Sequence, residues 1–99
     1  MANKLECYQN NTLTFTCSTP IDATGFTPYL TVKKNISDPS ALIEVIGEVS
    51  DSSTLFFTVP STDTSLIAGD YPFDITLEND ASIYTIVKDI FRIFDGVRY

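Results

Sequence analysis

The clearest pattern in the chain is the alternation of apolar and polar residues that follows Gly69. Large apolar side chains occupy every second position there: Tyr71, Phe73, Ile75 and Leu77. Acidic side chains occur in the opposite phase: Asp70, Asp74 and Glu78. A period of two indicates a β-strand with one face in a core and the other in water.

The same period recurs along the chain and predicts further strands. Residues 5–8 form a short first strand, and Asn10 and Asn11 supply a turn because asparagine tolerates positive φ. The inward phases of the next strands are expected to be apolar: Leu13, Phe15 and Cys17, then Phe26, Leu30 and Val32, then Leu55, Phe57 and Val59. Residues 83–87 and 90–94 give a last strand that is interrupted near Lys88 and Asp89.

Three segments depart from simple alternation. Residues 41–49 hold an apolar cluster that fits either a strand buried on both faces or one covered end of a sheet. Pro28 cannot donate a backbone hydrogen bond, so its strand is expected at an edge or with a bulge. Residues 61–67 carry the hydroxyls and the acid of a capped helical turn, which would cross from one sheet to the other.

About seven strands, with no helix longer than about two turns, predict an all-β fold of two packed sheets. Gly69-Asp70-Tyr71 has the form of the corner by which immunoglobulin-type sandwiches enter strand F, where the tyrosine hydroxyl returns to the backbone. Phe73 stands where antibody domains have their second cysteine. We therefore predict one immunoglobulin-like antiparallel β-sandwich domain over residues 1–99, without the inter-sheet disulfide.

Composition narrows the classes of function. The formal charge of −7 repels phosphate backbones, so nucleic acid is not expected as a partner. The chain has no His, the commonest general base and zinc ligand, and two Cys cannot complete a tetrahedral metal site. We expect no enzyme activity, no cofactor and no metal. Asp70, Asp74 and Glu78 fit a calcium site, an acidic docking stripe or, preferably, a solvated strand face.

The cysteines and the N-terminal residues indicate the cellular compartment in which the protein is expected. If Asn10 and Asn11 joined two paired strands, Cys7 would face Thr14 and Cys17 would face Lys4, so we expect two buried, reduced thiols. Residues 1–6 show no secretory pattern, and no apolar run approaches ~18 residues, so no membrane span is predicted. Both observations favour a reducing cytosol.

Aromatic residues outside the inward phases are the candidate docking anchors. Phe56 and Phe57 are adjacent, so they cannot point to the same side of one strand, and Phe91 with Phe94 raises the same question. A terminal segment can add to a neighbour's sheet without disturbing its own core. The candidate partner-binding residues are therefore at the C-terminal end: Phe91, Phe94, Val97 and Tyr99.

Two regions carry a resemblance to a known family. Residues 21–34 include Asp22-Ala23-Thr24-Gly25 and end in Lys33-Lys34, and residues 66–75 hold a Leu-x-x-Gly-x-Tyr corner, followed by Tyr84-Thr85-Ile86-Val87-Lys88. The order resembles the immunoglobulin-like β-sandwiches of tailed-bacteriophage virion proteins, in particular the N-terminal domain of baseplate upper proteins. Lys88-Asp89 replaces the Lys-Gly that often precedes the last strand in that family.

The resemblance implies a non-enzymatic virion component that is assembled in the bacterial cytoplasm. A solitary module suits an auxiliary or decoration capsid protein, present in multiple copies, that docks on the major capsid protein. The alternative is a tail, baseplate or fibre adaptor that docks on fibre or tail proteins. A carbohydrate-binding or adhesive module is a further alternative, although the chain lacks the Trp that often forms sugar platforms.

Overall fold

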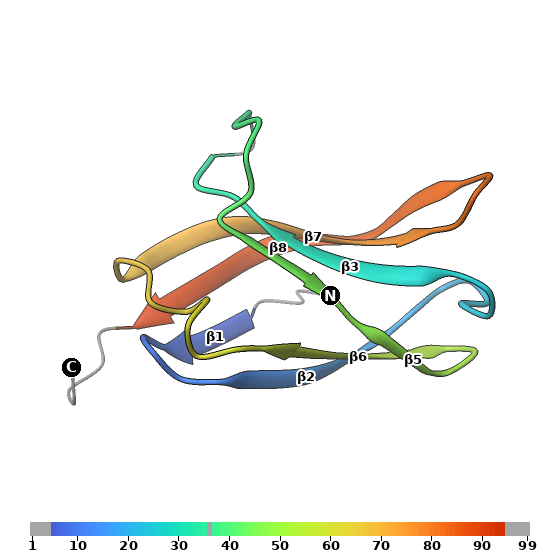
Figure 1. Cartoon of the computed structure of the whole chain (residues 1–99), viewed down its shortest axis with the longest axis horizontal. Coiled ribbons are helices and arrows are strands. Elements are labelled where there is room, and N and C mark those ends of the chain that lie inside the picture. The colour runs from blue at the N-terminus through green and yellow to red at the C-terminus, as the bar shows by residue number, and fades with distance from the viewer. Residues whose placement is uncertain (1–4, 36, 95–99) are drawn as a thin grey trace.

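The computed structural model describes residues 5–35 and 37–94, and its regular elements are all strands (Figure 1). The strands are β1 (Leu5–Tyr8), β2 (Leu13–Ser18), β3 (Thr27–Val32), β4 (Ile43–Ile46), β5 (Glu48–Asp51), β6 (Thr54–Val59), β7 (Gly69–Glu78) and β8 (Ile83–Phe94). They form a five-stranded sheet in the order β1-β8-β7-β3-β4 and a three-stranded sheet in the order β2-β6-β5. The predicted all-β, two-sheet architecture is confirmed, with eight strands in place of about seven.

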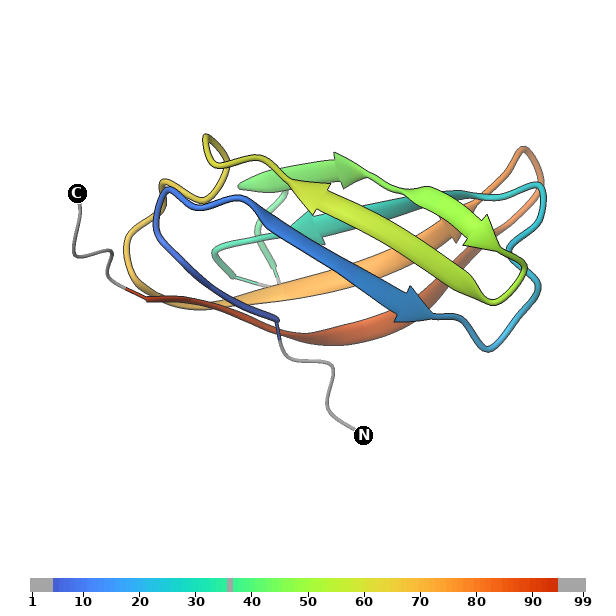
Figure 2. The same cartoon turned by 90° about the horizontal axis from the view of Figure 1, so that it is seen from below.

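The core lies between the two sheets, which face each other in Figure 2. The predicted inward phases of β3, β6 and β7 are confirmed. Their buried side chains are Leu30, Val32, Leu55, Phe57, Val59, Phe73, Ile75 and Leu77. The inward residues of β2 are only half-buried because this strand is at the edge of its sheet. Phe15 stacks on Phe57 of β6, with the ring centroids 5.2 Å apart.

The irregular apolar segment at residues 41–49 is two strands in different sheets. β4 pairs with β3, whereas β5 pairs with β6. Gly47 separates them, and its N–H donates to the Pro28 carbonyl over 2.9 Å. The alternation therefore changes at Gly47 because the chain leaves one sheet and enters the other, and neither predicted form of a single strand was correct.

The predicted pairing of the first two strands is wrong. β1 runs parallel to β8, with Cys7 beside Ile93, whereas Cys17 of β2 lies beside Leu55 in the other sheet. Asn10 does adopt a φ of 61°, but the turn there changes sheets instead of closing a hairpin. Both cysteines are free and half-buried. They stay apart because they belong to different sheets, not because of an offset within one hairpin.

The expectation that Pro28 marks an edge or a bulge is also wrong. β3 lies between β7 and β4, and Pro28 is buried opposite Leu77. The Pro28 carbonyl faces Gly47, and in an antiparallel strand the nitrogen of a residue points to the same side as its carbonyl. β4 ends at Ile46, so the ring occupies a position where no ladder donor is needed.

The last strand is continuous through Lys88 and Asp89, contrary to the predicted interruption. The irregularity lies earlier, because Val87 pairs with Ile75 and Thr85 pairs with Thr76, which leaves Ile86 as an extra residue. This bulge changes the side chain phase of β8. After it, Val87, Phe91 and Ile93 point into the core.

Residues 60–68 cross from β6 to β7 as predicted, but as turns and not as a helical turn. Thr64 is fully buried, and its hydroxyl donates to the Asn11 carbonyl over 2.7 Å. The predicted tyrosine corner is confirmed, because the Tyr71 hydroxyl donates to the Ile67 carbonyl. The corner fixes the chain where it enters β7.

We expect Tyr71→Phe to lower the free energy of unfolding by about 1 kcal/mol, because the ring stays and the hydroxyl bond to the Ile67 carbonyl is lost. Urea unfolding followed by circular dichroism measures the change. Tyr84→Phe is the matched control, since Tyr84 lies exposed near the β7–β8 hairpin. Equal effects of the two variants would show that the corner bond contributes nothing specific.

Candidate docking surface

The outer face of the five-stranded sheet gathers much of the exposed apolar surface of the described residues. Tyr8 and Phe94 are opposite each other on β1 and β8, and their rings are 5.5 Å apart. Ile46 on β4 and Ile83 on β8 are 67% and 68% exposed. Such side chains do not contribute to the core. Tyr8 and Phe94 form a contiguous apolar pair, whereas Ile46 and Ile83 are exposed singly on other parts of the face.

Basic side chains accompany these apolar groups. Lys88 and Arg92 belong to the outward phase of β8, and Lys33 and Lys34 directly follow the end of β3; these four are all the basic residues in the described part of the chain. Arg92 forms an ion pair with Asp70 of β7, with its Nε 2.7 Å from the carboxylate oxygen. This bond raises the pKa of the Arg92 guanidinium.

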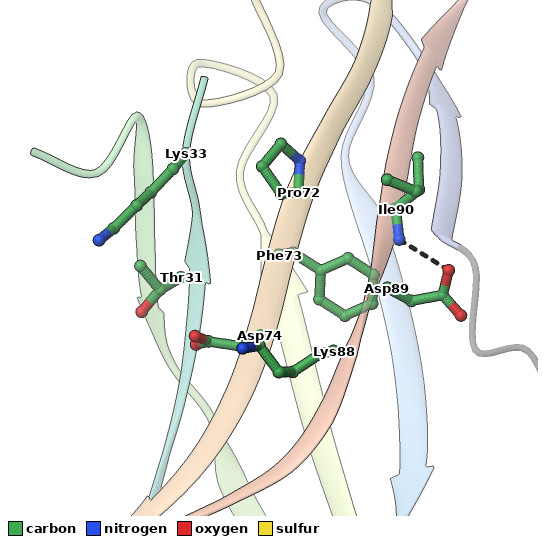
Figure 3. A pocket seen from close by; sticks show the side chains of 8 residues that line it. All are labelled: Thr31, Lys33, Pro72, Phe73, Asp74, Lys88, Asp89 and Ile90. Atoms are coloured by element: carbon green, nitrogen blue, oxygen red, sulfur yellow. Dashed lines mark hydrogen bonds between the residues drawn. The ribbon is translucent and has the colours of Figure 1, made fainter. Parts of the chain in front are cut away.

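A shallow depression of about 390 Å³ lies on this face. One row of side chains crosses it, because Thr31, Asp74 and Lys88 are neighbours on β3, β7 and β8. Figure 3 shows these three side chains with Lys33, Pro72 and Ile90 around the depression. The Asp89 carboxylate accepts a hydrogen bond from the N–H of Ile90 over 2.8 Å. The lining combines both charges with apolar atoms.

The acidic residues of β7 do not form a chelating group. Asp70, Asp74 and Glu78 share the outward phase, but residues four positions apart on a strand are separated by about 13 Å. Among the residues that the structure describes, no group of three or more His, Cys, Asp or Glu side chains could hold a metal ion. The geometry argues against a calcium site and is consistent with a strand face on which Asp70 is engaged by Arg92.

The outer face of the three-stranded sheet is chemically different. Its outward residues on β2 and β6 are mostly hydroxyl side chains: Thr14, Thr16, Ser18, Thr54 and Thr58. Phe56 is half-buried among them, opposite Thr16 and Glu48. The acidic residues of β5 have no basic counterpart on this sheet. The outer faces of the two sheets therefore differ in chemistry, and a partner would meet a different surface on each.

The predicted partner-binding residues have different locations. Phe91 is fully buried in the core, so it presents no surface to a partner, because the bulge at Ile86 places it in the inward phase. Phe94 is 37% exposed on the candidate surface beside Tyr8. Val97 and Tyr99 lie outside the described residues. Sequence reasoning missed Tyr8, Ile46 and Ile83, although an apolar residue in an outward phase is the signal that could have found them.

Cys7 and Cys17 are potential nucleophiles, and burial changes the pKa of both thiols. Burial raises the pKa of both Cys7 and Cys17, which keeps them protonated at neutral pH. A thiol is a weak nucleophile compared with its thiolate. The arrangement therefore supports structural roles for both cysteines.

No protein-family model matches the chain, and no curated protein matches it. Across the part of the chain that the structure covers, there is no helix with the length and apolar character needed to cross a membrane.

Proposed function

We propose that this chain is a non-enzymatic structural protein that docks on other proteins through the outer face of its five-stranded sheet. The proposed setting is the virion of a tailed bacteriophage, as an auxiliary or decoration capsid protein present in multiple copies. The setting follows from the resemblance of the two sequence regions to virion β-sandwich proteins. The mode of action follows from the surface described above.

One observation carries the docking proposal: exposed apolar side chains occupy the same face as the basic side chains of Lys33, Lys88 and Arg92. This face carries acidic side chains as well, among them Asp74 and the Asp70 that pairs with Arg92, so it offers a partner charges of both signs. Interfaces combine apolar anchors with charged groups that set orientation. Tyr8, Ile46 and Phe94 would be the anchors, and Lys33 and Lys88 the orienting charges.

The strand order supports the immunoglobulin-like part of the proposal. β2-β6-β5 corresponds to strands B, E and D of that sandwich, and β8-β7-β3-β4 corresponds to G, F, C and C′. The tyrosine corner at the start of β7 falls on the strand equivalent to F. A parallel β1 beside β8 completes the larger sheet.

Two alternatives remain distinct from the decoration protein. A tail, baseplate or fibre adaptor would use the same surface on a different partner. A carbohydrate-binding module would need an exposed aromatic platform, and the aromatic residue that lines the depression, Phe73, is buried. The depression itself therefore gives the sugar hypothesis little support.

Fractionation of purified virions tests the proposal. Particles from infected cells are separated into heads and tails, and the chain is quantified in each fraction by mass spectrometry. We expect it in the head fraction in many copies. Presence in tails alone would replace the capsid proposal with the adaptor, and absence from both fractions would contradict a virion role. Binding on a glycan array without capture of virion proteins would favour the carbohydrate alternative.

We expect Ile46→Glu to weaken docking by about tenfold or more, because it puts a charge on an exposed apolar anchor of the proposed surface. Incorporation into particles measures the loss. Ile67→Glu is the matched control, since Ile67 is 82% exposed but lies in the turn before β7, away from the sheet face. If both variants were incorporated equally, Ile46 would not be part of the interface.

A further inference from the structure

The free edge of β2 is an unprotected pairing surface. β2 pairs only with β6, so one side of this six-residue strand faces no other described strand. In constant-type immunoglobulin sandwiches the first strand covers this edge. Here β1 pairs with β8 in the other sheet and leaves the edge of β2 open.

The backbone groups that face this edge can be assigned from one bond. The Thr19 N–H donates to the Ser53 carbonyl over 2.9 Å, so odd-numbered residues of this segment point their backbone groups toward β6. Direction alternates along an antiparallel strand, and Thr14, Thr16 and Ser18 therefore point theirs away from β6. The Ser18 carbonyl accepts only a 3.3 Å bond from the Cys17 thiol, which is a weak donor.

The other sheet edges carry the features that block edge pairing. β1 contains Glu6, β4 contains Glu44, and β5 contains Glu48 and Asp51 with an irregular register. The part of β8 that extends past β1 has the bulge at Ile86 and the charges of Lys88 and Asp89. Charges and bulges on edge strands prevent association. β2 has no charge, no proline and no bulge.

We propose that two copies of this chain associate by antiparallel pairing of their β2 strands. A carboxylate would meet its own copy at each of the β1, β4 and β5 edges, whereas the β2 strands of two acidic chains meet without charge repulsion. The strand is also self-complementary, because hydroxyl side chains alternate with Leu13, Phe15 and Cys17 on the inner phase. The two copies would form one continuous six-stranded sheet.

The register of the two β2 strands is the one in which every outward-facing backbone N–H and C=O group forms a hydrogen bond. With the two-fold axis at Thr16, Thr16 faces its own copy and Thr14 faces Ser18, so all the outward-facing N–H and C=O groups are satisfied. Phe15 then faces Cys17 of the second copy, which covers two half-buried side chains and gives a favourable sulfur–aromatic contact. The outer faces of both five-stranded sheets remain free, so the dimer could bind two partners at once.

Sedimentation equilibrium of the full chain and a site-specific crosslink test the pairing. We expect the molecular mass to double with increasing concentration, and Thr16→Cys to form a disulfide between residues 16 of two copies, identified by peptide mapping. Antiparallel Cα spacing of about 5.5 Å at such a pair suits a disulfide. Thr58→Cys is the matched control, since Thr58 is exposed on the central strand β6.

Charge variants provide a second measurement that needs no crosslink. Thr16→Lys should keep the chain monomeric at all concentrations, whereas Thr58→Lys should leave the doubling of mass unchanged. A wild-type chain that stays monomeric, or equal crosslinking at residues 16 and 58, would overturn the proposal. Because β2 belongs to the other sheet, failure here leaves the docking surface untouched, and loss of docking in Ile46→Glu leaves the β2 dimer untouched.

Discussion

Phe57→Ala is expected to lower the free energy of unfolding by about 3–5 kcal/mol, the largest loss we expect from a single substitution. Phe57 is fully buried, and its ring stacks on Phe15 across the β2–β6 pair. Alanine would remove this contact and leave a cavity between the sheets. A domain of this size is stable by about 5–15 kcal/mol, so the variant would lose a large part of its stability.

Phe56→Ala is the matched control for Phe57→Ala, because the two residues are adjacent and identical in chemistry. Phe56 is half-buried on the outer face of β6, so we expect a loss of about 1 kcal/mol. Urea unfolding followed by tyrosine fluorescence or circular dichroism measures both. Equal losses, or a larger loss for Phe56→Ala, would contradict the assignment of Phe57 to the core.

Gly47→Ala is expected to lower the free energy of unfolding by about 1–3 kcal/mol, although alanine adds only one methyl group. A Cβ at this position would lie 2.6 Å from the Cε1 atom of Phe57 and 2.8 Å from the Phe56 carbonyl oxygen. The carbonyl belongs to the backbone of β6, so relief requires movement of a strand. Gly47 thus allows β4 and β5 to pass close to the core where the chain changes sheets.

Ile46→Ala is the control for the Gly47 substitution. Its side chain is 67% exposed, so truncation should change stability by no more than about 0.5 kcal/mol. Thermal unfolding of both variants gives the comparison. A Gly47→Ala variant as stable as the wild type would show that β6 can move away from the added methyl group without loss of stability. That result would contradict close packing between Gly47 and β6.

The sequence predicted those features that depend on local alternation. The inward phases of β3, β6 and β7 were correct because each of these strands has one buried and one solvated face, which makes the period of two visible. The tyrosine corner was recognisable because the bond from Tyr71 to Ile67 spans only four residues. Local chemistry of this kind is encoded in neighbouring residues.

Features that depend on which strand pairs with which were not predictable from alternation. The period of β1 is the same whether it pairs with β2 or with β8, so the expected hairpin could not be distinguished from the observed parallel pair. Pro28 is tolerated inside the sheet only because β4 ends beside it. The bulge at Ile86 changes the phase of Phe91, and a single extra residue leaves no clear mark in the pattern.

The candidate surface was predictable only in part. Phe94 was identified from its position near the C-terminal end of the chain, but its neighbour Tyr8 comes from the other end of the sequence and joins it through the parallel β1–β8 pair. Ile46 was hidden in the segment where the chain changes sheets. The candidate surface spans several strands, so it becomes visible only when the strand order is known.

Hydroxyl-radical footprinting of the free chain and of the chain bound to its particle tests the central claim most directly. Oxidation is measured by mass spectrometry at Ile46, Ile83 and Phe94 on the proposed face, and at Ile67 as an exposed site away from it. We predict that binding protects the first three residues and leaves Ile67 unchanged. Unchanged oxidation at Ile46, Ile83 and Phe94 in the bound state would contradict docking through this sheet.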